Sequence, residues 1–278
     1  MSQAFPAPAK LNLFLHVVGR RDDGYHLLQS VFRLIDRTDT VHLELRDDGV
    51  VERLGDVPGV PEAQDLTVRA ARLLQTRAPA GAGVNIRLEK NLPMGGGLGG
   101  GSSDAATVLL ALNRLWGVNL SRAALQALAL QLGADVPVFV FGRPAFAEGV
   151  GEILHPVAVP PAWYVVLTPP VHVPTASVFA APELTRDTPP LKIAPFSAGM
   201  GHNDLEPVVV KRHPEVARHL AWLARFGEAR MTGSGACVFA SFDTEDAAHD
   251  VLRLLPESTR GFVAQGLDRH PLYDFCAG

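Results

Sequence analysis

Cysteine is scarce in this chain. Its 278 residues include two cysteines, Cys237 and Cys276, which form no C-x-x-C pair and no spacing typical of metal ligands. We therefore expect two unpaired thiols in a reducing compartment rather than a disulfide framework. The N-terminus also lacks a basic start followed by an apolar run, so we expect no signal peptide and predict a cytoplasmic location.

An excess of charge of one sign is also missing. Lys and Arg number 25 and Asp and Glu 29, which gives a net charge of −4, and no basic run is longer than that of Arg20-Arg21. This balance favours neither nucleic acid nor an anionic membrane as a partner. The segment from Ile153 to Pro182 has no Asp, Glu, Lys or Arg, but seven prolines interrupt it. We expect a buried strand with irregular connections there, not a membrane span.

What the chain does contain is typical of a soluble globular protein. Hydrophobic residues make up 47% and charged residues 19% of the composition. The length is sufficient for a substantial core and for two domains.

The most informative stretch is rich in glycine and runs from Pro93 to Asp104. It lies between an alternating run, Val84 to Glu89, and a strongly apolar run, Ala105 to Trp116, which predicts strand, glycine loop and helix. Glycine tolerates positive φ and lets a ligand approach the backbone, and the start of a helix offers unpaired N–H groups. This arrangement predicts a phosphate site. The alternative, a flexible linker, is disfavoured because the stretch directly joins two apolar elements.

Two other nucleotide motifs fit less well. Gly95, Gly97 and Gly100 match G-x-G-x-x-G, but the next predicted element is a helix between Ser121 and Gly133 and not a second parallel strand. A Walker loop would need a Gly-Lys-Ser/Thr sequence, which is missing.

Charge is sparse around the glycine stretch. Between Lys90 and Arg114 the one formal charge is Asp104. The charge of a phosphate must therefore be met by backbone N–H groups, the helix dipole, a metal ion and a cation from elsewhere in the chain.

The N-terminal segment from Lys10 to Val18 alternates like a strand. One face carries Leu11, Leu13, Leu15 and Val17, and the other carries Lys10, Asn12, Phe14 and His16. A lysine at the start of a strand is usually solvated, so these residues alone do not indicate catalysis.

The remaining pattern predicts a mixture of helices and strands. Strands are expected at Ser30 to Phe32, Thr40 to Leu45, after Gly133-Ala-Asp-Val-Pro, at Tyr164 to Leu167, after the glycine loop that begins at Met231, and at Gly261 to Ala264. Helices are expected at Leu66 to Thr76 with Asp65 as N-cap, after Thr175 as cap, after Asn203, from Pro214 to near Gly227, and at Glu245 to Leu255. The segment from Asp47 to Pro61 is expected to be an exposed, turn-rich connection.

The stretch from Pro93 to Ala106 resembles the glycine-rich motif of the GHMP kinases. With Pro-Ala-Lys-Leu-Asn-Leu at 8–13 and Asp-Gly-Tyr-His at 23–26, the likeness extends from residue 8 nearly to the C-terminus. The resemblance implies an α+β, two-domain GHMP kinase fold. It would have an N-terminal ATP-binding α/β domain over 1–155 and a C-terminal ferredoxin-like α+β domain over 156–278.

Within this family, the chain resembles members that phosphorylate the 2-hydroxyl of 4-diphosphocytidyl-2-C-methyl-D-erythritol in non-mevalonate isoprenoid (terpenoid) biosynthesis. The resemblance implies ATP and Mg²⁺ as cofactors, a small-molecule partner, and a monomer or weak homodimer. Three alternatives stay open. They are a kinase for homoserine, mevalonate or a sugar, a nucleotide-binding protein without catalysis, and a dehydrogenase.

The resemblance also assigns residues, none of them as a protein ligand to a metal. Lys10 and the Asp135 of Gly-Ala-Asp-Val-Pro are the implied catalytic pair, although a lone aspartate there is usually a cap or turn residue. The implied nucleotide-binding residues are Asp65, Lys90, Pro93, Met94, Gly95, Gly96, Gly97, Leu98, Gly99, Gly100, Gly101, Ser102, Ser103 and Asp104. Asp65 and Asp104 depart from the family, which often has asparagine at both positions.

The implied substrate-binding residues are Asn12, Tyr25, His26, Thr175 and Phe179. Tyr25 and Phe179 would stack on a cytosine from opposite sides, and His26 would bond to its edge. Without the resemblance, these three side chains would be ordinary core or surface groups.

Overall fold

The computed structural model describes residues 1–192, 196 and 199–275. Cys237 is a buried free thiol, whereas Cys276 lies outside the described residues. Among the described helices, none has the length and apolar composition needed to cross a bilayer.

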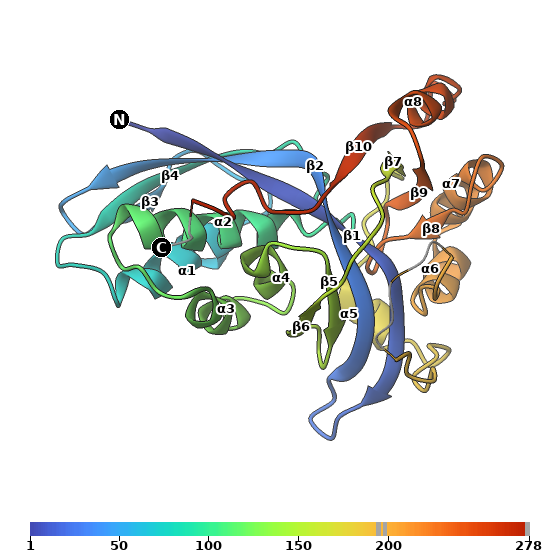
Figure 1. The fold of residues 1–278 in the computed structure, drawn as a ribbon, viewed down its shortest axis with the longest axis horizontal. Helices are drawn as coiled ribbons and strands as arrows, with labels where there is room; N and C mark the ends of the chain where they lie inside the picture. The colour runs from blue at the N-terminus through green and yellow to red at the C-terminus, as the bar shows by residue number, and fades with distance from the viewer. Residues whose placement is uncertain (193–195, 197–198, 276–278) are drawn as a thin grey trace.

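A long antiparallel hairpin joins the two halves of the molecule (Figure 1). It consists of β1 (Gln3–Arg20) and β2 (His26–Arg46), connected by a turn in which Gly24 has φ +90°. The strands expected at Ser30 to Phe32 and at Thr40 to Leu45 are confirmed as strand, but their separation is wrong, since both belong to β2. The strand continues through its charged middle, where Arg33 and Asp39 are buried and paired with groups from other elements.

The strands form one ten-stranded sheet, with order β3-β4-β2-β10-β7-β9-β8 along its main path. The other strands are β3 (Val51–Arg53), β4 (Gly83–Glu89), β5 (Ala145–Glu148), β6 (Ile153–Pro156), β7 (Trp163–Leu167), β8 (Arg230–Met231), β9 (Val238–Phe242) and β10 (Gly261–Leu267). Strand β3 lies inside the segment expected to be an exposed turn. It forms because it pairs in parallel with β4 and buries Val51.

Helices cover one side of the sheet in the first half (Figure 1). They are α1 (Leu66–Gln75), α2 (Gly100–Leu115), α3 (Arg122–Leu130) and α4 (Val136–Phe141), preceded by the 3₁₀ turn η1 (Glu62–Gln64). The predicted caps of α1 and α3 are confirmed, since Asp65 accepts from the N–H of Thr67 and Ser121 from that of Ala124. Helix α2 is the central element, because it is buried along most of its length.

Helix α4 replaces a predicted strand. Its first five residues, Val136 to Val140, are all buried, so the apolar run has no polar face from which periodicity could be read. Pro137 fits the first turn of a helix, and Gly142, with φ +71°, ends it. Packing against α2 and α3 decides the conformation here, against the β propensity of valine and phenylalanine.

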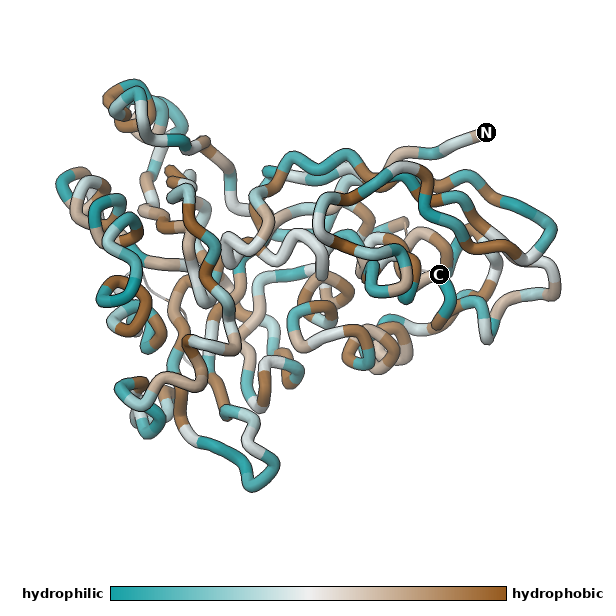
Figure 2. The backbone as a smooth tube through the Cα atoms, turned by 180° about the vertical axis from the view of Figure 1, so that it is seen from behind, coloured by the Kyte–Doolittle hydropathy of each residue, from teal (hydrophilic) through white to brown (hydrophobic). Residues whose placement is uncertain are grey.

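The second half places α5 (Thr175–Phe179), α6 (Glu206–Arg212), α7 (Pro214–Leu223) and α8 (Glu245–Arg253) around β7, β8, β9 and β10. Figure 2 shows hydrophobic and hydrophilic residues alternating along the outer helices, as amphipathic helices require. The α+β fold class is thus confirmed. The domain boundary between residues 155 and 156 stays a prediction. Strand β1 contributes to two hydrophobic cores, since Phe5 packs with the helices of the first half and Val17 packs with β7 and the helices of the second half.

Candidate active site

Two cavities meet at the glycine loop. The larger, about 750 Å³, is lined by residues of both halves, among them Lys10, Asn12, Tyr25, His26, Asp135, Thr175 and Phe179. The smaller, about 420 Å³, lies between the glycine loop, the start of α1 and Lys90. Gly95, Gly97, Gly99 and Ser102 line both. A ligand in one cavity can therefore reach a ligand in the other across these residues.

The glycines of this loop are required by its geometry. Gly95, Gly97 and Gly99 have φ of +69°, +78° and +73°. A Cβ on Gly97 would lie 2.1 Å from the carbonyl oxygen of Thr232, and one on Gly99 would lie 2.8 Å from the ring of Phe139. Side chains are thus excluded both by φ and by space.

The loop leads into α2, and the first backbone N–H groups of this helix have no hydrogen-bond partner within the helix. The first backbone bond of the helix runs from the N–H of Ser103 to the carbonyl of Gly99 at 2.8 Å. The N–H groups of Gly100, Gly101 and Ser102 precede this ladder, and all three residues line the smaller cavity. The helix start therefore offers the donors and the positive dipole end that phosphate prefers.

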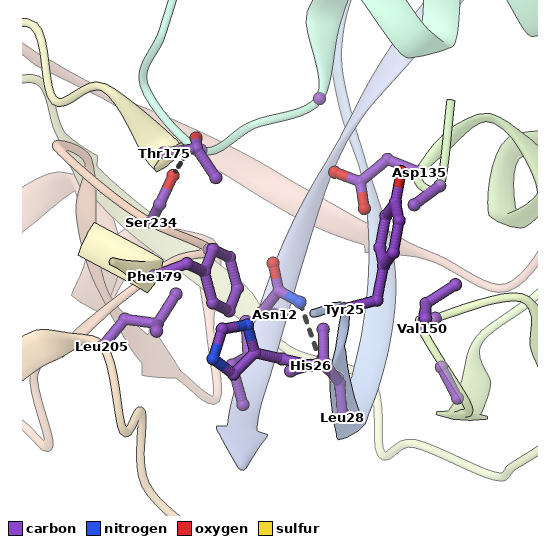
Figure 3. Close-up of a pocket in the computed structure, with 18 of the residues that line it drawn as sticks. Asn12, Tyr25, His26, Leu28, Asp135, Val150, Thr175, Phe179, Leu205 and Ser234 are labelled. Carbon is purple, nitrogen blue, oxygen red and sulfur yellow. Dashed lines mark hydrogen bonds between the residues drawn. The ribbon is translucent and has the colours of Figure 1, made fainter. Parts of the chain in front are cut away.

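Lys10 and Asp135 come together at the larger cavity. The Lys10 ammonium lies 3.5 Å from the Asp135 carboxylate and donates to Oδ1 of Asn12 at 2.5 Å. Lys10 is 2% exposed, whereas the Asp135 side chain is 44% exposed and, although it precedes α4, makes no capping bond. Figure 3 shows the Asp135 carboxylate and the Asn12 amide facing the same space. A fixed cation thus stands beside an accessible carboxylate.

Asn12 is held by groups far away in the chain. Its Nδ2 donates to Oγ of Ser30 at 2.8 Å, and its backbone N–H donates to Oγ1 of Thr232 at 2.9 Å. Thr232 belongs to the glycine loop that begins at Met231, in which Cys237 donates its N–H to the carbonyl of Gly96 at 3.1 Å. The two glycine loops and β1 are therefore tied together beside Lys10.

Lys90 lies between two buried carboxylates. It donates to Oδ2 of Asp104 at 2.5 Å and also pairs with Asp39. Burial would lower the pKa of the Lys90 ammonium, but the two carboxylates raise it. Burial raises the pKa of Asp104 to about 7, although Lys90 works in the opposite direction. The cation that Asp104 needs beside a phosphate site is therefore Lys90.

Most of the expected nucleotide-binding residues line the smaller cavity. These are Asp65, Lys90, Pro93, Met94, Gly95, Gly96, Gly97, Gly99, Gly100, Gly101, Ser102 and Asp104. Two others do not. Leu98 is 1% exposed in the core and its carbonyl accepts from the N–H of Lys10, and the hydroxyl of Ser103 is buried and donates to the carbonyl of Pro8. For both side chains packing, not ligand contact, explains the position.

The Asp65 carboxylate is already occupied. It accepts from the N–H and hydroxyl of Thr67 and from Arg53, at 2.8, 2.6 and 2.8 Å. Asp65 therefore caps α1 and binds an arginine, which accounts for an acid where the family often has asparagine.

Three of the five predicted substrate residues, Tyr25, His26 and Phe179, form the aromatic end of the larger cavity. Phe179 and His26 stack with ring centroids 5.0 Å apart, and Tyr25 is 65% exposed. Figure 3 shows Phe179 and Tyr25 on opposite sides of this space. Two aromatic side chains thus border a slot at this end of the cavity.

Thr175 does not cap its helix as expected. It is the first residue of α5, which Pro174 precedes, and no side-chain capping bond forms. Its hydroxyl instead bonds with that of Ser234 at 2.7 Å, and both residues line the larger cavity (Figure 3).

Several site residues were not found from the sequence. Their contacts are made across the fold: Ser30, Asp39, Arg186, Thr232 and Ser234. Thr232 and Ser234 could have been found, because both lie in the glycine loop beginning at Met231 that the sequence analysis named. Arg186 and Asp39 carry no local signal.

Known proteins are similar to this chain over nearly its whole length. The model of the GHMP kinases N terminal domain matches residues 65–143, and that of the GHMP kinases C terminal domain matches 191–259. The 4-diphosphocytidyl-2-C-methyl-D-erythritol kinase of Thiobacillus denitrificans is 82% identical over 275 residues, covering 99% of both chains. The enzyme of that name from Nitrosospira multiformis is 66% identical, covering 97% of this chain and 93% of its own.

Solved structures agree. A crystal structure of 4-(cytidine 5'-diphospho)-2C-methyl-D-erythritol kinase superposes with a TM-score of 0.80 at 35% identity, covering 96% of this chain and 99% of that chain. A mevalonate kinase structure has a TM-score of 0.68 at 15% identity over 96% and 100% of the two chains, which shows the shared fold alone. The chain therefore belongs to the GHMP kinase family and, within it, to the 4-diphosphocytidyl-2-C-methyl-D-erythritol kinases.

Proposed function

We propose that this chain transfers the γ-phosphoryl group of ATP to the 2-hydroxyl of 4-diphosphocytidyl-2-C-methyl-D-erythritol, in non-mevalonate isoprenoid synthesis. The observation that carries the proposal is the Lys10–Asp135 pair, whose charged groups are 3.5 Å apart, in the larger cavity, which shares four lining residues with the smaller one. Full-length relatives with this name support it. Membership of a kinase family argues against a dehydrogenase.

The smaller cavity suits the triphosphate of ATP. Its floor is the glycine loop and the first turn of α2. Because this stretch contains no lysine or arginine, the free N–H groups of the helix start would bind the phosphates. The γ-phosphate would lie at Gly97, Gly99 and Ser102, since these residues also open onto the larger cavity. Positioning of this kind is the main requirement of phosphoryl transfer.

Mg²⁺ is the ion that we propose with ATP. Among the described residues no cluster of three His, Cys, Asp or Glu side chains could hold a metal, so the chain offers no cage of its own. This fits an ion that keeps its waters and takes most of its ligands from phosphate oxygens. Ser102, which lines both cavities, is the hydroxyl placed to touch it. When bound, Mg²⁺ would neutralise charge on the phosphates.

The catalytic roles follow from exposure and charge. An alcohol is far less acidic than a carboxylic acid, so Asp135 cannot ionise the hydroxyl beforehand. The bond from the substrate oxygen to the γ-phosphorus forms, the bond from that phosphorus to the β-phosphate oxygen breaks, and the alcohol proton passes to Asp135 late in the transfer. Lys10 is buried and fixed by Asn12, and it stabilises the negative charge on the attacking substrate oxygen and on the β-phosphate oxygen that leaves.

Asp135→Asn tests this assignment. General-base catalysis contributes roughly 10²–10⁴-fold, so turnover should fall by about that factor while ATP binding persists. Asp250→Asn, which changes an exposed carboxylate on α8, is the matched control and should leave turnover unchanged. Near wild-type turnover in Asp135→Asn would remove Asp135 from this role.

The acceptor is tested by an ADP-release assay with the cytidine-linked alcohol, mevalonate and homoserine in parallel. Transfer to the cytidine compound alone, with competition by CMP, supports the proposal. Transfer to a small alcohol would move the chain to another GHMP activity, and no transfer to any of them would favour a nucleotide-binding protein without catalysis. We further propose that the chain acts in the cytoplasm as a monomer or weak homodimer, which sedimentation of the purified protein would check.

A further inference from the structure

All three nitrogens of the Arg186 guanidinium group donate hydrogen bonds at the aromatic end of the larger cavity. Its Nη2 donates to the carbonyls of Phe179 and Ala181 at 2.9 and 2.7 Å, and its Nη1 donates to that of Leu184 at 2.9 Å. The third nitrogen, Nε, donates to Nε2 of His26 at 3.1 Å. One side chain thus holds the end of α5 that carries Phe179 and, at the same time, the ring stacked on it.

The bond to His26 has one possible direction. A guanidinium group has donors and no acceptor, so Nε2 of His26 must be the unprotonated, accepting nitrogen. A neutral imidazole with Nε2 unprotonated carries its proton on Nδ1. Burial, and then the charges of Arg186 and Arg20, lower the pKa of His26, which keeps the ring neutral.

The protonated nitrogen is free for a ligand. Within the parts of the chain that the structure describes, no group pairs with Nδ1 of His26, and this atom is not buried. The ring lines the larger cavity and lies against Phe179, at the slot that a flat ring can enter. His26 therefore presents an N–H donor, and not an acceptor, at the edge of that slot.

We propose that Arg186 is a positioning residue for base selection: it locks His26 in the Nδ1–H tautomer and so selects a pyrimidine whose ring nitrogen accepts a hydrogen bond. This rests on the proposed function, which places a cytosine in the slot. Cytosine has an unprotonated N3 on this edge, whereas uracil has an N–H there. The Nδ1–H of His26 would donate to N3 of cytosine. In uracil it would face another N–H donor, with which it cannot form a hydrogen bond.

The tautomer can be read without any substrate. In ¹⁵N-labelled full-length protein, long-range proton–nitrogen correlation spectra distinguish Nδ1–H from Nε2–H imidazoles, and a His26→Gln variant identifies the His26 signals. The wild type should show the Nδ1–H pattern at a pH where the ring is neutral. Arg186→Ala should lose this pattern.

A matched control is Arg212→Ala. Arg212 also donates to a carbonyl of α5, that of Ser177 at 3.1 Å, and pairs with Glu183 at 3.0 Å, but it makes no bond to His26. Loosening of α5 alone would affect both variants alike. We expect Arg212→Ala to keep the Nδ1–H pattern.

Binding provides the second measurement. By calorimetry, Arg186→Ala should weaken CMP binding about five- to tenfold and reduce the preference for CMP over UMP by a similar factor, whereas ATP binding should be unchanged. Arg186→Lys should not restore the preference, because an ammonium group cannot hold His26 and three carbonyls in one plane.

An Nε2–H pattern in the wild type overturns the proposal, as does an unchanged pattern or an unchanged CMP-to-UMP preference in Arg186→Ala. These outcomes are distinct from failure of the proposed function. If the cytidine-linked alcohol is not phosphorylated while the Nδ1–H pattern and its loss are observed, the proposed reaction fails and the role of Arg186 in ordering His26 stands.

Discussion

Asp104 is a surplus charge beside the smaller cavity. Lys90 lies between it and Asp39, so one ammonium serves two buried carboxylates. Asp39 also accepts from the N–H groups of Asn91 and Leu92 at 2.5 and 2.8 Å. Among the described residues, Oδ1 of Asp104 has no hydrogen-bond partner. Asp104 is therefore the member of this group that gains most from a proton.

The effect on stability follows from the pKa. Burial raises the pKa of Asp104 from 3.8 to about 7, so the folded state binds this proton more tightly than the unfolded state. Stability is then lost as the pH rises between these two values, which is the reverse of an ordinary salt-bridged aspartate. The full shift corresponds to about 4 kcal/mol of unfolding free energy. Between about pH 5 and about pH 8, roughly 3 kcal/mol of it is lost.

Asp104→Asn isolates this effect, because the amide keeps the shape and cannot ionise. The unfolding free energy of each protein is measured by urea denaturation at about pH 5 and about pH 8. The difference between Asp104→Asn and the wild type should shift by about 3 kcal/mol in favour of the variant as the pH rises over this range. Asp243→Asn, at an exposed position, should follow the wild type at each pH. Parallel curves for wild type and Asp104→Asn would refute the argument, since Asp104 would then be ionised at no cost.

Three further outcomes are expected. Lys10→Ala should lower turnover more than it weakens ATP binding, because its charge matters most in the transition state, and a drop in melting temperature without loss of rate would make Lys10 structural. Gly97→Ala should raise the KM for ATP about tenfold or more, since its Cβ would meet the Thr232 carbonyl at 2.1 Å, and an unchanged KM would contradict the loop geometry. Cys237, buried with its pKa raised to about 12, should not react with a thiol reagent in the native protein, and peptide mapping that finds a labelled Cys237 would contradict its burial.

Local patterns account for what could be predicted from the sequence. Asp65 and Ser121 cap their helices as expected, because a capping bond spans two or three residues. The glycines at 95, 97 and 99 take positive φ, as their lack of a Cβ suggested. The pairing of Lys10 with Asp135 was expected from family resemblance, since no local pattern joins residues so far apart.

Other features were decided by tertiary packing. The run from Val136 to Phe141 is helical because all sides of it are covered, and β2 continues through its charged middle because Arg33 and Asp39 find partners from distant segments. The sequence by itself determined the caps of α1 and α3 and the backbone shape of the glycine loop, which depend on neighbours in the chain. The tertiary structure alone decided the pairing of Arg186 with His26 and of Lys90 with Asp39, because charges and hydrogen bonds between segments depend on distance in space, which no local pattern encodes.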